Sequence, residues 1–170
     1  MDAEQLKEKL KLARTALEGY WRDWSIERNR PAAATGFGMC RFSATFLANI
    51  LDENWVVAGG EPLYPTDDGV NQAGYFDGKS WHGHYWVTNG ELIVDLAASQ
   101  FGGDKVTVVP VHSPQYRENY SELELEEHLD HVSVRADAWA NDFSKNFPEF
   151  FAKSEQLPDA SRLKLVHRAA

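Results

Sequence analysis

The dipeptide Asn89-Gly90 constrains this chain more than any other feature. It lies between two runs, 80–88 and 91–96, in which β-branched, aromatic and polar residues alternate. Asn-Gly in this position is the strongest short signal for a β-hairpin, because both residues adopt the positive φ values of a type I′ turn at little cost. The sequence therefore predicts two antiparallel strands joined by a two-residue turn.

The predicted hairpin accounts for an aspartate inside the apolar run Leu-Ile-Val-Asp-Leu. A buried carboxylate without a partner is costly. A two-residue turn pairs Thr88 with Glu91 and, further along the ladder, His84 with Asp95. Opposed residues point to the same face of a sheet, with Cβ atoms about 4.5–5.5 Å apart. Asp95 is thus predicted to orient the His84 imidazole, either for catalysis or only to hold the hairpin together.

Helical spacing of apolar residues predicts an amphipathic helix over 2–27 and a second helix over 40–51. Ser121 and Glu124 form a capping box, which predicts a C-terminal helix that ends before Pro148. Further strands are expected at 54–59 and 104–111, with a long polar loop between 59 and 80.

This order of elements predicts an α+β fold in which N-terminal helices pack on a small antiparallel sheet and a C-terminal helix follows. With 170 residues, the chain is expected to form a single domain over 1–155, followed by a tail over 156–170.

The formal net charge of −9 argues against a nucleic-acid partner or an anionic membrane surface, since both attract basic proteins. The sequence contains no apolar run long enough to cross a membrane. Its first residues are too charged for a signal peptide. We therefore expect a cytoplasmic protein, or one secreted without a Sec-type signal, while the oligomeric state stays open.

Cys40 is the one cysteine of the chain, so no internal disulfide is possible. Such a residue is most often a small buried apolar side chain. Here it follows the glycine-rich stretch Gly-Phe-Gly-Met and begins a predicted helix, where the helix dipole and free N–H groups favour a thiolate. Cys40, His84 and Asp95 then supply a nucleophile, a base and an orienting carboxylate in that order.

The stretches GFGMCRFSATFLANIL, GHYWV and LIVDLAASQF resemble the papain-like cysteine-enzyme superfamily, in its transglutaminase-like branch. In that branch a cysteine opens a helix packed on an antiparallel sheet, and a histidine and an aspartate lie on adjacent strands. VDLAASQF is similar to the D-x-T-x-x-Q-F sequence of bacterial and phage members, with Ala97 in place of the threonine.

The resemblance implies a cysteine-dependent amide hydrolase or acyltransferase that acts on a peptide or protein amide through a thioester and needs no cofactor. Peptidase, glutamine deamidase and transglutaminase activities all stay open, with hydrolysis favoured because the chain is short and has no Asp-x-Asp-x-Asp-Gly loop. The Cys40 backbone N–H would form half of an oxyanion hole. Candidates for the second donor or the cleft wall are Gln100, Gln115, Trp81 and Trp86.

Two other functions are compatible with the sequence. The same fold could serve as a non-enzymatic interaction module whose Cys-His-Asp set has only a structural role. Alternatively, His82 and His84 could bind a metal ion, with a third ligand from Asp95, Cys40 or His112.

Overall fold

The computed structural model describes residues 2–31, 36, 38–63 and 72–152, and it confirms the predicted α+β fold. The tail expected at 156–170 lies outside the described residues. The elements are α1 (Ala3–Glu27), α2 (Cys40–Ile50), β1 (Val56–Gly60), β2 (Gly74–Phe76), β3 (Trp81–His82), β4 (His84–Thr88), β5 (Leu92–Asp95), η2 (Ala98–Phe101), β6 (Thr107–Pro110), β7 (Tyr116–Arg117), α3 (Glu122–Asn146) and η3 (Pro148–Phe150).

The long helices begin where side-chain caps satisfy their first N–H groups. Asp2 and Gln5 form a reciprocal capping box at the start of α1. Ser121 and Glu124 form the predicted box at the start of α3. Because the first N–H groups of a helix have no partner within it, these caps determine where each helix starts.

The strands form two antiparallel sheets, one with the order β1-β4-β5-β6 and a smaller one with the order β3-β2-β7. The single strand predicted over 80–88 is wrong, because the chain leaves one sheet for the other at Gly83. The loop predicted over 59–80 contains β2, and β7 was not predicted. Strands of two or three residues are too short to show a period of two, so their sequences give no signal.

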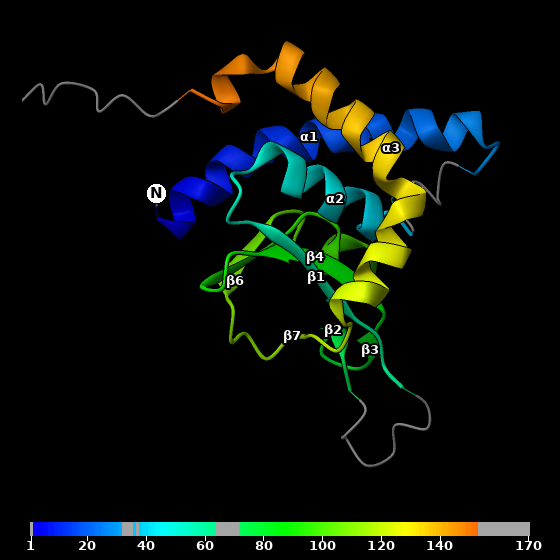
Figure 1. Ribbon diagram of the computed structural model, residues 1–170, viewed down its shortest axis with the longest axis vertical. Helices are drawn as coiled ribbons and strands as arrows, with labels where there is room; N and C mark the ends of the chain where they lie inside the picture. The colour runs from blue at the N-terminus through cyan, green and yellow to red at the C-terminus, as the bar shows by residue number, and fades with distance from the viewer. Residues whose placement is uncertain (1, 32–35, 37, 64–71, 153–170) are drawn as a thin grey trace, which may run out of the picture.

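The helices lie together on one side of the strands (Figure 1). One face of the larger sheet contributes Tyr85, Val87, Val94 and Leu96 to the main apolar core with the helices. Its other face contributes Trp86 and Ile93 to a second cluster, with Tyr75 and Tyr116 of the smaller sheet. His84 and Asp95 belong by parity to this second face.

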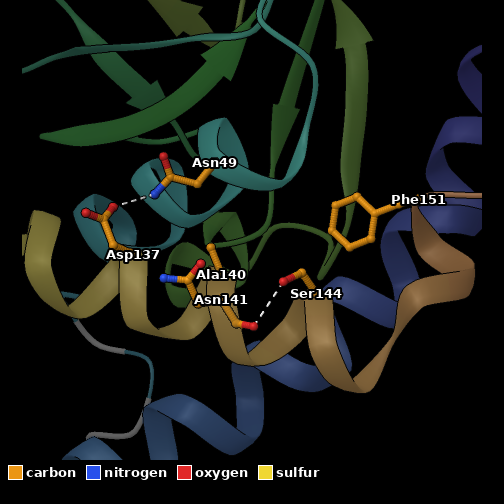
Figure 2. Close-up of a pocket in the computed structure, with 6 residues that line it drawn as sticks. All are labelled: Asn49, Asp137, Ala140, Asn141, Ser144 and Phe151. Atoms are coloured by element: carbon orange, nitrogen blue, oxygen red, sulfur yellow. Dashed lines mark hydrogen bonds between the residues drawn. The ribbon is translucent and has the colours of Figure 1, made fainter.

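Helix α2 packs between the sheet and α3. At the C-terminal end of α2, the Asn49 Nδ2 group donates a hydrogen bond of 2.7 Å to Asp137 of α3, beside a pocket that Ser144 and Phe151 also line (Figure 2). Cys40 is at the opposite end of this helix, so the pocket of Figure 2 is not the site of the predicted chemistry.

The hairpin forms, but its predicted register is wrong. Val87 faces Val94 and Thr88 faces Ile93, a shift of two residues from the predicted pairs. The turn residues are Gly90 and Glu91, since the Asn89 N–H donates to the Leu92 carbonyl.

The chemistry of Asn89 explains the shift. Only Gly90, with φ of 86°, lies in the left-handed region, whereas a type I′ turn at Asn89-Gly90 would need positive φ at both residues. The Asn89 side-chain oxygen instead accepts hydrogen bonds from the backbone N–H groups of Glu91 and Leu92, at 3.0 and 2.9 Å. This side-chain turn is an alternative that asparagine readily forms.

The shift leaves the predicted His84–Asp95 contact in place. Because side chains alternate faces with a period of two, a slip of two residues keeps every residue on its predicted face. Extending the observed register places Trp86 opposite Asp95, and His84 becomes the diagonal neighbour on the same face. Diagonal neighbours are within reach of long side chains.

We predict that Asn89→Ala lowers the free energy of unfolding by about 1–2 kcal/mol, because two backbone N–H groups lose their acceptor. Asn89→Asp keeps an acceptor oxygen at the same place and should lose less than half as much. Urea unfolding of both variants measures the difference. Equal losses would show that the side-chain acceptor does not hold this turn.

Candidate active site

The centre of the site is a fully buried histidine–aspartate pair. His84 Nε2 lies 2.7 Å from Asp95 Oδ2, and the two side chains are 0% and 1% exposed. An ionised carboxylate can only accept hydrogen bonds, so Nε2 must bear the proton. The other ring nitrogen, Nδ1, is then the one available for proton transfer.

Asp95 is stabilised by donors from three directions. Besides His84, its Oδ2 accepts a hydrogen bond of 2.9 Å from the Tyr116 hydroxyl. Its Oδ1 accepts the backbone N–H groups of Ala97 and Ala98, at 2.7 and 3.1 Å, where the chain enters η2. Burial alone would favour the neutral acid, but these donors and the charge of His84 hold the pKa of Asp95 below its usual value.

The protonation of His84 depends on the same balance. Burial, the largest influence, lowers its pKa, whereas the charge and hydrogen bond of Asp95, followed by interactions with the Cys40 side chain, raise it. The net effect raises the pKa of His84 to about 10. The imidazolium form is therefore favoured at neutral pH, next to an anionic Asp95.

Gln100 lies at Nδ1 of the imidazole, and the Cys40 side chain also interacts with the ring. Cys40 is 8% exposed. Gln100 Nε2 lies 3.3 Å from Nδ1, and Gln100 Oε1 accepts a 3.1 Å hydrogen bond from the Gly38 N–H. Gly38 has φ of 69°, a backbone conformation that favours glycine just before the helix that Cys40 begins.

Aromatic rings enclose the imidazole. Phe101 meets it edge to face at 5.2 Å between ring centres, Tyr75 lies at 5.6 Å, and Trp86 lies at 6.3 Å. Trp86 thus shares the face of His84, as its parity predicts. Its buried indole N–H has no hydrogen-bond partner among the described residues.

The two remaining oxyanion candidates make their contacts away from the imidazole. Trp81 packs against Phe76 and beneath the Arg117 guanidinium. Gln115 is exposed, and its backbone carbonyl accepts a hydrogen bond from Phe76. Of the four candidates, Gln100 and Trp86 are therefore the ones in contact with the imidazole.

His82 pairs with a different carboxylate from the one that binds His84. Its Nε2 lies 2.9 Å from Asp77 Oδ2, and its ring stacks on Phe101 at 4.4 Å. Nε2 of His84 is engaged by Asp95 instead, and Gln100 Nε2 lies 3.3 Å from its Nδ1. In the described part of the chain no cluster of three or more His, Cys, Asp or Glu side chains forms a metal site.

Two residues that sequence reasoning missed stabilise the site. Tyr116 reaches Asp95 from β7, and no local pattern could have indicated so distant a contact. Arg14 is only 7% exposed in α1, and its guanidinium donates to the carbonyl of Leu96, the residue after Asp95. Arg14 did have a signal, because it lies in the apolar stripe of the first helix, between Leu10 and Leu17.

No family model, curated protein or solved structure matches this chain. Among the described helices, none is both long enough and apolar enough to span a membrane. The function is therefore inferred from the residues of the site.

The charged pair should leave a signature in the pH dependence of stability. Because the pKa of His84 is raised from 6.5 to about 10, its contribution is complete below pH 6.5 and is lost as the pH rises towards 10. The pKa of Asp95 is lowered, so its contribution is present above about pH 4 and is lost on acidification.

We predict that Asp95→Asn lowers the unfolding free energy at pH 7 by about 3–5 kcal/mol, since it leaves His84 buried without its charge partner. The same change should flatten the decline in stability between pH 6.5 and 10. Asp77→Asn removes the carboxylate of the more exposed His82 pair and should leave that decline intact. Denaturant titrations across pH measure both, and identical curves for the two variants would contradict the assignment.

Proposed function

We propose that the protein is a cysteine-dependent amide hydrolase or acyltransferase, a transglutaminase-like member of the papain-like superfamily. The observation that best supports this is the division of roles at His84. Its Nε2 is bonded to a buried carboxylate, and its ring also interacts with a thiol at a helix N-terminus. Covalent acyl transfer requires a nucleophile next to a base, and an orienting group next to that base.

In the proposed resting state, Cys40 has already given its thiol proton to His84, and Asp95 stabilises the imidazolium that pairs with the thiolate. The thiolate attacks the carbonyl carbon of a peptide or side-chain amide and forms a tetrahedral intermediate. His84 then donates its Nδ1 proton to the leaving amine as the carbon–nitrogen bond breaks, which leaves a thioester on Cys40. Water or an amine, deprotonated by His84, attacks the thioester and releases the thiol.

Two donors lie near the place where the oxyanion would form. The Cys40 backbone N–H belongs to the first turn of α2, whose N–H groups have no partner within the helix. Gln100 Nε2 lies beside Nδ1, at the reacting end of the imidazole. Donors of this kind are each worth about 10²–10³-fold in rate in other acyl-transfer enzymes.

Burial favours one second candidate, a non-enzymatic module in which the three residues have a structural role. His84 is 0% exposed and Cys40 is 8% exposed, so little of either residue is open to a substrate. The metal-dependent alternative has less support, because both nitrogens of His84 have protein partners.

An activated ester separates these functions without knowledge of the natural substrate. We predict that p-nitrophenyl acetate gives a burst of nitrophenolate equal to one acyl group per chain and that mass spectrometry finds the acetyl group on Cys40. Cys40→Ala should abolish the burst and keep the fold, since one thiol contributes little packing. His84→Gln should slow acylation by about 10²–10⁴-fold, because the general base is lost.

His82→Gln is the matched control, since it removes a neighbouring imidazole that pairs with Asp77 instead. It should change the acylation rate by less than about threefold. A burst that survives in Cys40→Ala would reject the cysteine mechanism, and a Cys40 that stays unacylated in the wild type would favour the structural role.

A further inference from the structure

We propose that Tyr116 is a positioning residue that fixes Asp95 and limits how strongly this carboxylate holds the His84 proton. This inference deepens the proposed function and rests on it for its catalytic meaning. Tyr116 comes from β7 of the smaller sheet, whereas the pair it contacts lies on β4 and β5 of the larger sheet. Its hydroxyl therefore links the two sheets at the acid of the candidate triad.

The Tyr116 hydroxyl donates to the same Asp95 oxygen that accepts the hydrogen bond of the His84 imidazole. Tyr116 donates to Asp95 Oδ2 at 2.9 Å, and this is the same oxygen that binds His84 Nε2 at 2.7 Å. The other oxygen, Oδ1, is occupied by the N–H groups of Ala97 and Ala98. Because Oδ2 accepts hydrogen bonds from both His84 and Tyr116, each of these hydrogen bonds weakens the other.

The phenol is fixed in place and always acts as a donor to Asp95. Its ring lies 5.2 Å from that of Tyr75 and meets Trp86 edge to face at 5.1 Å. Burial, followed by the charge of Asp95, raises the pKa of Tyr116 well above its ordinary value. The hydroxyl thus keeps its proton at neutral pH, and Asp95 is the acceptor beside it. The Thr107 side chain also hydrogen-bonds this hydroxyl, from the position opposite Asp95 on β6.

This sharing matters for acid catalysis. During acylation of Cys40, the imidazolium must release its Nδ1 proton to the leaving amine. A carboxylate with Oδ2 accepting only from His84 would stabilise the imidazolium more, so His84 would be a weaker acid. Tyr116 thereby moderates the effect of Asp95 while it also keeps the carboxylate in the plane that the imidazole needs.

The test is a titration of His84 in Tyr116→Phe, which removes one oxygen and keeps the ring. The probe is the side-chain signal of the buried histidine in protein labelled with ¹⁵N-histidine, recorded across pH. We expect the pKa of His84 to rise by about one unit, which is the size expected for the loss of one hydrogen bond to a charged group. A purely structural role would lower the unfolding temperature without moving this titration.

Tyr75→Phe is the matched control, because it removes a buried phenol that contacts both Tyr116 and His84. Among the hydrogen bonds of the described residues, none joins Tyr75 to Asp95. It should leave the His84 titration within about 0.3 units of the wild type. Thr107→Val is the second variant, which keeps Tyr116 and removes the group that hydrogen-bonds it. We expect a smaller shift in the same direction, and this variant decides the question if Tyr116→Phe does not fold.

Unchanged titrations in Tyr116→Phe and Thr107→Val, or a shift as large in Tyr75→Phe, would overturn the proposal. These readouts need no turnover, so they are independent of the proposed function. A shifted titration in a protein whose Cys40 is never acylated would support the role of Tyr116 and reject the enzyme. Acylation with an unmoved titration would reject the role of Tyr116 alone.

Discussion

The buried charge of Asp95 is the constraint on which the arrangement of this protein depends. A carboxylate without solvent must have its lone pairs filled, and here each donor comes from a different part of the fold. His84 approaches along β4, Tyr116 along β7, and the chain itself turns into η2 to present the N–H groups of Ala97 and Ala98. The junction of the two sheets is thus built around one anion.

The parity of the β-sheet explains why the His84–Asp95 contact could be predicted even though the turn could not. The Asn-Gly signal correctly indicates a hairpin, but asparagine can shape a turn with its backbone or its side chain, and local sequence does not choose between them. The predicted turn and the observed turn differ by two residues in register, so either one places His84 and Asp95 on the same face of the sheet. A slip of one residue would have separated them, which is why the face was more predictable than the pairing.

Contacts between distant segments are where sequence reasoning failed. The bounds of α1 follow from its local apolar spacing, the start of α3 from its capping box and the end of α3 from Pro148, and they were predicted within a residue or two. The break at Gly83 and the strand that positions Tyr116 depend on pairing across the chain, and segments of two or three residues have no periodicity to read. Arg14 is an intermediate case. A charged residue in an apolar stripe indicates a buried partner, but the sequence does not show that this partner is the Leu96 carbonyl.

Two histidine–aspartate pairs lie close together here, and their surroundings give them different capacities. His82 and Asp77 are 32% and 20% exposed at the side chain, and Asp77 also accepts the N–H groups of Lys79 and Ser80 in a local turn. Water screens that pair, so its charges have little influence beyond the turn. The pair of His84 and Asp95 has no such screening, and the thiol of Cys40 lies in the same low-dielectric space. The same two residue types therefore stabilise an exposed turn at one position and form a buried charge pair that interacts with the thiol at the other.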